Sequence, residues 1–142
     1  MKVSIEHGSW KALEHECLRV RLMVFVAEQK VPKEEEIDAD DPRAVHFVAR
    51  DPGRMVLATA RLLSDGRIGR LAVLKPWRGR GIGRQVLDAV IDYARAQGMP
   101  EVTLHAQCHA RGFYEKAGFA AEGPEFDECG IRHILMKKRL AD

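Results

Sequence analysis

A glycine-rich turn between a strand and a helix constrains the fold of this chain more than any other feature. The turn Arg78–Gly83 follows a strand-like segment and opens a helical repeat that runs to about Gln97. Residues 101–107 then alternate between apolar and polar positions, as expected of a strand. A strand that reaches its neighbour through a crossover helix pairs with it in parallel. The sequence therefore predicts a parallel strand pair at the centre of the fold.

Antiparallel strands are expected around this unit. Turn signals Asp-Pro-Gly and Ser-Asp-Gly separate three strand-like runs before the glycine-rich turn, at residues 45–50, 55–63 and 67–74. The other expected elements are a strand at 2–7, a helix at about 10–27, a short helix at about 109–116, and strands at 119–121 and 131–137. We therefore expect an α+β fold: a single domain over residues 1–142, with a mixed, mostly antiparallel central sheet flanked by helices.

Composition excludes several classes of protein. The 142 residues are 46% hydrophobic and 31% charged, which is typical of a globular domain. No uncharged apolar run approaches the ~18 residues of a membrane span, and no signal-peptide pattern opens the chain. The three cysteines, Cys17, Cys108 and Cys129, are too few and too scattered for a disulfide framework. We expect a cytoplasmic protein, with neither membrane nor metal binding.

The net charge of +2 conceals a local concentration of positive charge. Residues 67–84 contain six basic residues and no acidic one, whereas the remainder of the chain is acidic. Such a field indicates an anionic ligand at one place, and a solvated basic loop is the alternative. Few aromatic residues accompany the basic cluster and no helix carries a basic stripe, so nucleic-acid binding is not expected.

The glycine-rich turn has the chemistry of a phosphate-binding site. Its glycines let the backbone bend tightly and approach a ligand, and the first N–H groups of the following helix lack internal partners. Arg78, Arg80 and Arg84 add charged donors. The Gly-Lys-Ser/Thr ending of a P-loop is absent, and the third glycine, Gly83, comes one residue too early for the dinucleotide fingerprint.

Two motifs in this order resemble the GCN5-related N-acetyltransferases (GNAT). Arg78–Gly83, after the strand Leu71–Val73, fits the acyl-CoA consensus Gln/Arg-x-x-Gly-x-Gly/Ala. The second motif, Asn-x-x-Ala-x-x-Leu-Tyr-x-Lys-x-Gly-Phe, is matched at its spacings by Gln107, Ala110, Phe113, Tyr114, Lys116, Gly118 and Phe119, with glutamine replacing asparagine. Residues 21–32 and 128–133 further resemble the small ElaA-like branch of the family.

The resemblance implies that acyl-CoA lies in a cleft where two parallel strands splay apart. The donor would be acetyl-CoA, with no metal, and an amine would attack the thioester directly. The N–H of Val73 would polarise the thioester carbonyl. The residues implied to contact acyl-CoA are Leu71, Ala72, Val73, Arg78, Gly79, Arg80, Gly81, Ile82, Gly83, Arg84, Gln107, Tyr114 and Lys116.

The same resemblance suggests the catalytic groups. Tyr114 is placed to protonate the departing thiolate, the alternative being an ordinary amphipathic core tyrosine. Glu28, Glu128 and His133 are candidate bases for the amine proton. Glu28 and Glu128 could equally be surface residues, and His133 a buried histidine with satisfied hydrogen bonds. A chain of water molecules is a further alternative.

The expected function is transfer of an acetyl group from acetyl-CoA to a primary amine of a small molecule, protein or peptide. The alternatives are a non-catalytic CoA-binding or partner-binding module, and synthesis of a homoserine-lactone-type product. A homodimer is left open. The acidic run at residues 34–41 either forms a solvated face or attracts a cationic amine at the substrate entrance.

Overall fold

A seven-stranded sheet organises the computed structural model, which describes residues 2–36 and 38–141. Its strand order is β1-β2-β3-β4-β5-β7-β6. The strands are β1 (Ser4–Gly8), β2 (Val45–Arg50), β3 (Val56–Leu62), β4 (Arg67–Val73), β5 (Glu101–Gln107), β6 (Ala120–Glu128) and β7 (Ile131–Arg139). The helices are α1 (Trp10–Arg21), α2 (Lys33–Glu36), α3 (Ile82–Ala96) and α4 (Arg111–Lys116). Shorter or π-helical turns are η1 (Leu22–Glu28), η2 (Asp41–Arg43), η3 (Lys75–Trp77) and η4 (Cys108–Ala110).

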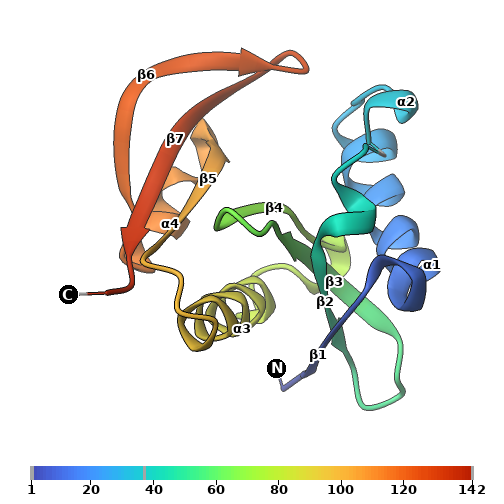
Figure 1. Cartoon of the computed structure of the whole chain (residues 1–142). Coiled ribbons are helices and arrows are strands. Elements are labelled where there is room, and N and C mark those ends of the chain that lie inside the picture. Colours follow the sequence, from blue (N-terminus) through green and yellow to red (C-terminus); the bar gives the residue numbers. More distant parts are fainter. Residues whose placement is uncertain (1, 37, 142) are drawn as a thin grey trace.

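The central strand pair confirms the expected α+β architecture. All neighbouring strands are antiparallel except β4 and β5, which run parallel. Their ladder is short, because only Arg67 pairs with Thr103 and Ile68 with Leu104. Beyond Ile68 the two strands diverge, and the molecule divides into a half containing β1–β3 and a half containing β5–β7 (Figure 1).

Helices cover the sheet as the apolar periodicity predicts. The stripe of α3 that includes Val86, Val90 and Ala94 is fully buried against the sheet. On β2, Phe47 belongs to the α3 cluster and its neighbour Val48 to the cluster built by α1, because successive strand residues face opposite sides. Burying a Val or Leu side chain contributes roughly 1.5–3 kcal/mol, so these two clusters hold the sheet between its helices.

Two elements differ from expectation in a way that affects the cleft. The helix expected over 10–27 changes at Leu22 into the π-helical turn η1, where the N–H of Gln29 donates to the carbonyl of Val24. The last strands are longer than expected, because β6 continues through Pro124 to Glu128 across a register shift against β7. A proline is tolerated there because β6 lies at the sheet edge. The β6–β7 hairpin therefore reaches over the divergence toward α2 (Figure 1).

Part of the acidic run at 34–41 differs from both of its expected interpretations. Asp41 is fully buried, and its two oxygens accept hydrogen bonds from Arg21 at 2.9 and 3.0 Å. Asp38 accepts hydrogen bonds from both terminal nitrogens of Arg61, at 2.8 and 2.9 Å. Glu36 is also buried and pairs with Arg21. These three acids form an internal ion network, whereas Glu34 and Glu35 of the same run are exposed.

No helix in the part of the chain that the structure describes combines the length and the apolar character that crossing a bilayer requires.

Candidate functional site

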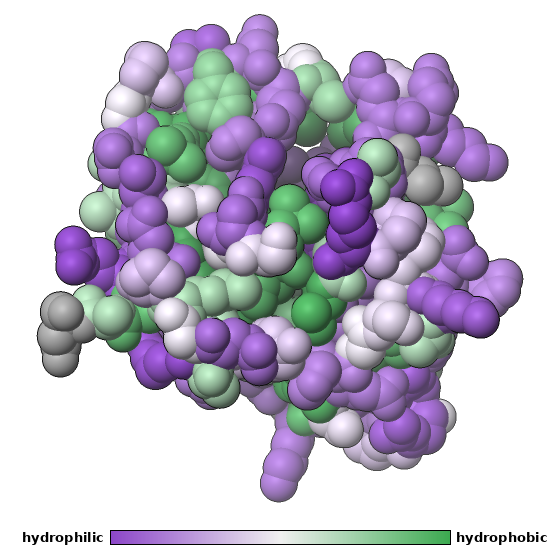
Figure 2. Space-filling model, in the orientation of Figure 1, coloured by the Kyte–Doolittle hydropathy of each residue, from purple (hydrophilic) through white to green (hydrophobic). Residues whose placement is uncertain are grey.

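A cavity of about 740 Å³ opens where β4 and β5 diverge. Both halves of the molecule line it, and the glycine-rich turn lies along the same cavity. A bulge in β4 helps to separate the strands: the register against β3 shifts between Thr59 and Arg61, and Arg70 adopts a left-handed φ of 54°. Figure 2 shows this face hollowed, with hydrophobic side chains surrounded by hydrophilic ones.

One edge of β4 is available to a ligand along the cavity. The N–H of Leu74 donates to Leu57 in β3 at 2.9 Å, so the neighbouring Val73 directs its backbone groups to the opposite edge. The Val73 carbonyl accepts a hydrogen bond from Arg78 Nε at 2.9 Å. Leu71, Ala72 and Val73 all line the cavity, as expected for the strand that would contact acyl-CoA.

The glycine-rich turn forms an open cradle at the N-terminus of α3. Gly79 and Gly81 have backbone φ values of 78° and 80°, which residues other than glycine rarely adopt. A Cβ at either position would meet no atom within 4 Å. Gly81 is the N-cap of α3 and offers no side-chain cap, so the first N–H groups of the helix lack that partner. Gly83 packs closely on Val73 and Phe113.

Arginines surround this cradle. Arg78 donates both terminal nitrogens to Glu28 at 2.6 and 2.7 Å. This hydrogen-bonded pairing lowers the pKa of Glu28. Arg84 binds Asp88 at 2.9 Å on the surface of α3, and Arg80 is exposed in the turn. The cradle therefore carries the donors expected for a phosphate group, with Glu28 holding one of them.

Tyr114 enters the cavity from α4, and Lys116 lines it on the same helix. The ring of Tyr114 packs edge-on against Phe113 and Phe119, with centroids 5.1 and 5.9 Å apart. This burial raises the pKa of Tyr114 to about 12, so its phenol remains protonated at neutral pH. A protonated phenol beside a cleft is a source for a proton.

Gln107 makes a contact that the sequence did not indicate. Its amide nitrogen donates to Gln29 at 2.8 Å, and the Gln29 amide donates back at 3.2 Å. Gln29 directly follows the π-helical turn η1, and Gln107 ends β5, so the pair bridges the two halves across the cavity. The longer arm of glutamine, compared with the asparagine of the motif, makes this reciprocal contact.

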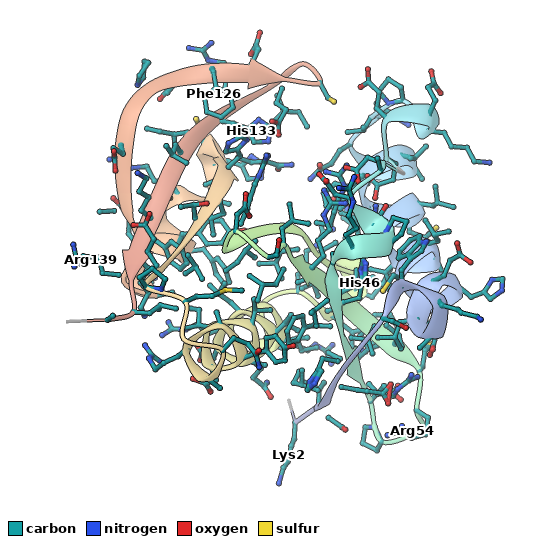
Figure 3. The ribbon with its side chains drawn as sticks, viewed as in Figure 1. Lys2, His46, Arg54, Phe126, His133 and Arg139 are labelled. Carbon is teal, nitrogen blue, oxygen red and sulfur yellow. The ribbon has the colours of Figure 1, made fainter. Side chains whose placement is uncertain are left out.

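His133 and Glu128 lie together at the β6–β7 end of the cavity. Figure 3 shows His133 there beside Phe126. His133 is only 6% exposed, stacks on Phe126, and places Nδ1 2.7 Å from the carbonyl of Ile131. A carbonyl only accepts, so Nδ1 carries the proton and Nε2 of the neutral ring has a free lone pair. Glu128 Oε2 lies 3.6 Å from that Nε2.

His105 and Arg67 complete this group and were not expected from the sequence. His105 Nδ1 lies 3.0 Å from Glu128 Oε1 and 2.9 Å from Arg67 Nη2. The alternation on β5 places His105 on the same face of the strand as Gln107, two residues later. That alternation is the signal that could have placed His105 at the cavity. Glu28 lies apart from this group, on the Arg78 side.

Comparison with known proteins identifies the class that this fold and cleft define. Residues 12–140 match the family described as the acetyltransferase (GNAT) domain. The chain therefore belongs to the GNAT family of acetyltransferases.

Three relatives illustrate the similarity. The uncharacterized N-acetyltransferase YjcF of Bacillus subtilis is 38% identical, covering 84% of this chain and 87% of its own. An acyl-CoA N-acyltransferase structure from Pseudomonas aeruginosa is 30% identical with a TM-score of 0.85, covering 96% and 99% of the two chains. Escherichia coli ElaA is 26% identical with a TM-score of 0.86, covering 97% and 100%.

Proposed function

We propose that this acetyltransferase moves an acetyl group from acetyl-CoA to a primary amine. One observation carries the proposal: a single cavity joins the glycine cradle at the α3 N-terminus to the His133–Glu128 pair. The cradle and the free edge of β4 fit a long phosphate-bearing ligand, and His133 and Glu128 fit a group that exchanges a proton. Acetyl-CoA supplies the thioester carbon that the amine attacks directly, and a thiolate as the leaving group.

The residues that would hold acetyl-CoA are distributed along the cavity. The backbone N–H groups at the start of α3 would bind the pyrophosphate, because a helix N-terminus favours anions. Arg78, Arg80 and Arg84 would add charge-assisted hydrogen bonds. The outward N–H of Val73 would donate to the thioester oxygen, where negative charge develops.

Proton transfers would use the groups at either side of that N–H. His133 would accept the amine proton at Nε2, and Glu128 would stabilise the resulting imidazolium. Tyr114 would donate its phenolic proton to the departing thiolate. Glu28 is favoured less as the base, because Arg78 occupies both of its oxygens. We therefore propose that Glu28 competes with the ligand for Arg78, and that His133 is the base.

Binding and turnover test the two parts of this proposal. Calorimetry should show saturable acetyl-CoA binding that is weakened by Arg78→Glu and Arg80→Glu. Thiol release, followed with a panel of primary amines, should depend on both substrates. Absence of acetyl-CoA binding would contradict the proposal outright. Binding without transfer to any amine would instead support a non-catalytic CoA-binding module.

A further inference from the structure

The charged groups of the β6–β7 end of the cavity indicate the chemistry of the acceptor. Three arginines and three acids of the internal ion network balance one another: Arg21, Arg61 and Arg70 against Glu36, Asp38 and Asp41. The other acids of the run, Glu34, Glu35 and Asp40, lie outside this network and do not line the cavity. Among the described residues that line this end of the cavity, the charged ones outside the network are Arg67 and Glu128.

Arg67 and Glu128 compete for one atom. Both approach His105 Nδ1, at 2.9 and 3.0 Å, so their own polar atoms lie within about 6 Å of each other. An imidazole nitrogen either accepts through its lone pair or donates through its proton. When Nδ1 accepts from Arg67 it cannot donate to Glu128, and when it donates to Glu128 it cannot accept from Arg67. One charged group therefore always lacks its hydrogen bond at this atom.

We propose, building on the acetyl transfer above, that the acceptor is a zwitterionic amino carboxylate of the α-amino-acid class. Its carboxylate pairs with Arg67, and its ammonium is received by Glu128 before His133 takes the proton. The short spacing between Arg67 and Glu128 suits a molecule whose two charges are separated by one carbon. A single ligand of this kind gives both competing side chains a partner.

Arg70 offers a second donor to the same carboxylate. It is half-buried on the same strand, donates to Asp38 Oδ2 at 3.1 Å, and makes longer hydrogen bonds of 3.3 to 3.4 Å to the carbonyls of Glu35 and Glu36. Burial lowers the pKa of Arg70 despite the neighbouring acids Glu36 and Asp38. Burial removes water from the Arg70 guanidinium, and a bound carboxylate would offset the free-energy cost of that loss. Arg61 beside it keeps a buried Nε without a partner among the described residues.

Matched acceptors test the inference directly. Each standard L-α-amino acid is assayed beside its methyl ester and its decarboxylated amine, with acetyl-CoA and detection of the acetylated product. At least one free amino acid should exceed its own ester and amine in kcat/KM by roughly tenfold or more, the value of a lost charged hydrogen bond. Esterification lowers the basicity of the amine, so intrinsic reactivity favours the ester and cannot produce this preference.

Variants of Arg67 then test whether this arginine causes the preference for the free amino acid. Arg67→Gln should reduce the ratio of kcat/KM for acid over amine at least tenfold, and Arg67→Lys should restore part of it. Arg95→Gln, which changes an exposed arginine on α3 that pairs with Asp92, is the matched control and should leave the ratio unchanged. Calorimetric titration of the preferred amino acid into the enzyme–CoA complex gives a readout independent of turnover, and Arg67→Gln should weaken that binding.

Each outcome decides between the two proposals. Esters or decarboxylated amines acetylated as well as the amino acids would overturn the amino-carboxylate inference and leave acetyl transfer standing. If no amine of any kind is acetylated, acetyl transfer fails, and calorimetry decides the inference by itself. Absence of amino-acid binding to the CoA complex would then overturn it.

Discussion

Both oxygens of Glu28 accept hydrogen bonds from the guanidinium of Arg78, at 2.6 and 2.7 Å. The pair joins the end of η1 to the turn before α3, across the mouth of the cavity. A phosphate group that binds Arg78 must compete with this carboxylate. Glu28 and acetyl-CoA are therefore expected to be alternative partners of one arginine.

Replacing Glu28 by glutamine should release Arg78. The pair is exposed, and such pairs contribute about 0.2–1 kcal/mol, so CoA should bind up to roughly fivefold more tightly. Calorimetry with CoA measures this change, and steady-state kinetics provide the control. A loss of kcat by two orders of magnitude, with no gain in affinity, would instead identify Glu28 as the base.

The Tyr114→Phe variant should lose turnover while keeping its affinity for acetyl-CoA. A missing general acid typically costs roughly 10²–10⁴-fold in rate. Because burial raises the pKa of Tyr114 to about 12, the phenol should not ionise below about pH 10. Up to pH 10, the tyrosinate absorbance of the Tyr114→Phe variant should therefore equal that of the unaltered protein. An unchanged kcat would remove Tyr114 from the reaction.

Arg21 should be a major determinant of stability. It is 1% exposed, contacts Glu36 and Asp41, and lies 5.3 Å from the centre of the Trp10 ring. Arg21→Met leaves two buried carboxylates without this partner, which should lower the free energy of unfolding by about 3–5 kcal/mol. Urea unfolding measures the loss. The exposed control Arg95→Gln should change it by less than about 0.5 kcal/mol.

Asp38 should make the fold sensitive to acid. Partial burial raises its pKa, but the hydrogen bonds and charge of Arg61 outweigh that effect and lower the pKa to about 2. A carboxyl whose pKa is depressed by folding stabilises above its unfolded value, near 3.8, and that stability is lost as the pH falls toward 2. Asp38→Asn should flatten the fall in unfolding free energy across this interval. An equally steep fall in the variant would contradict the assignment.

The glycines of the cradle should differ in their tolerance of alanine. Gly81 has a left-handed φ of 80°, so Gly81→Ala should cost about 1–2 kcal/mol in backbone strain. Gly83 has no such φ, and a Cβ there would meet Val73 and Phe113 at ordinary contact distances of 3.5 and 3.6 Å. Gly83→Ala should therefore be close to neutral. Chemical unfolding of the two variants compares them directly.

Local pattern was sufficient for the order of the elements and for the cradle. The four-residue stripe of α3 and the alternation of β5 predicted both elements closely, because each repeat reports which side chains face the core. The glycine-rich turn with its arginines predicted an anion site, because its chemistry is contained in consecutive residues. The strand expected at 119–121 was too short, because β6 continues through Pro124, which an edge strand tolerates.

Contacts between distant segments were decided only by the tertiary structure. The acidic run at 34–41 resembled a solvated surface, yet Arg21 from α1 pairs with its Asp41 and Arg61 from β3 with its Asp38. Arg67, His105 and Glu128 come from three strands, and no spacing along the chain relates them. The sequence by itself determined the glycine-rich turn and its arginines, because that motif is local. Folding alone determined the β6–β7 end of the cavity, because its chemistry depends on which charged groups the sheet brings together.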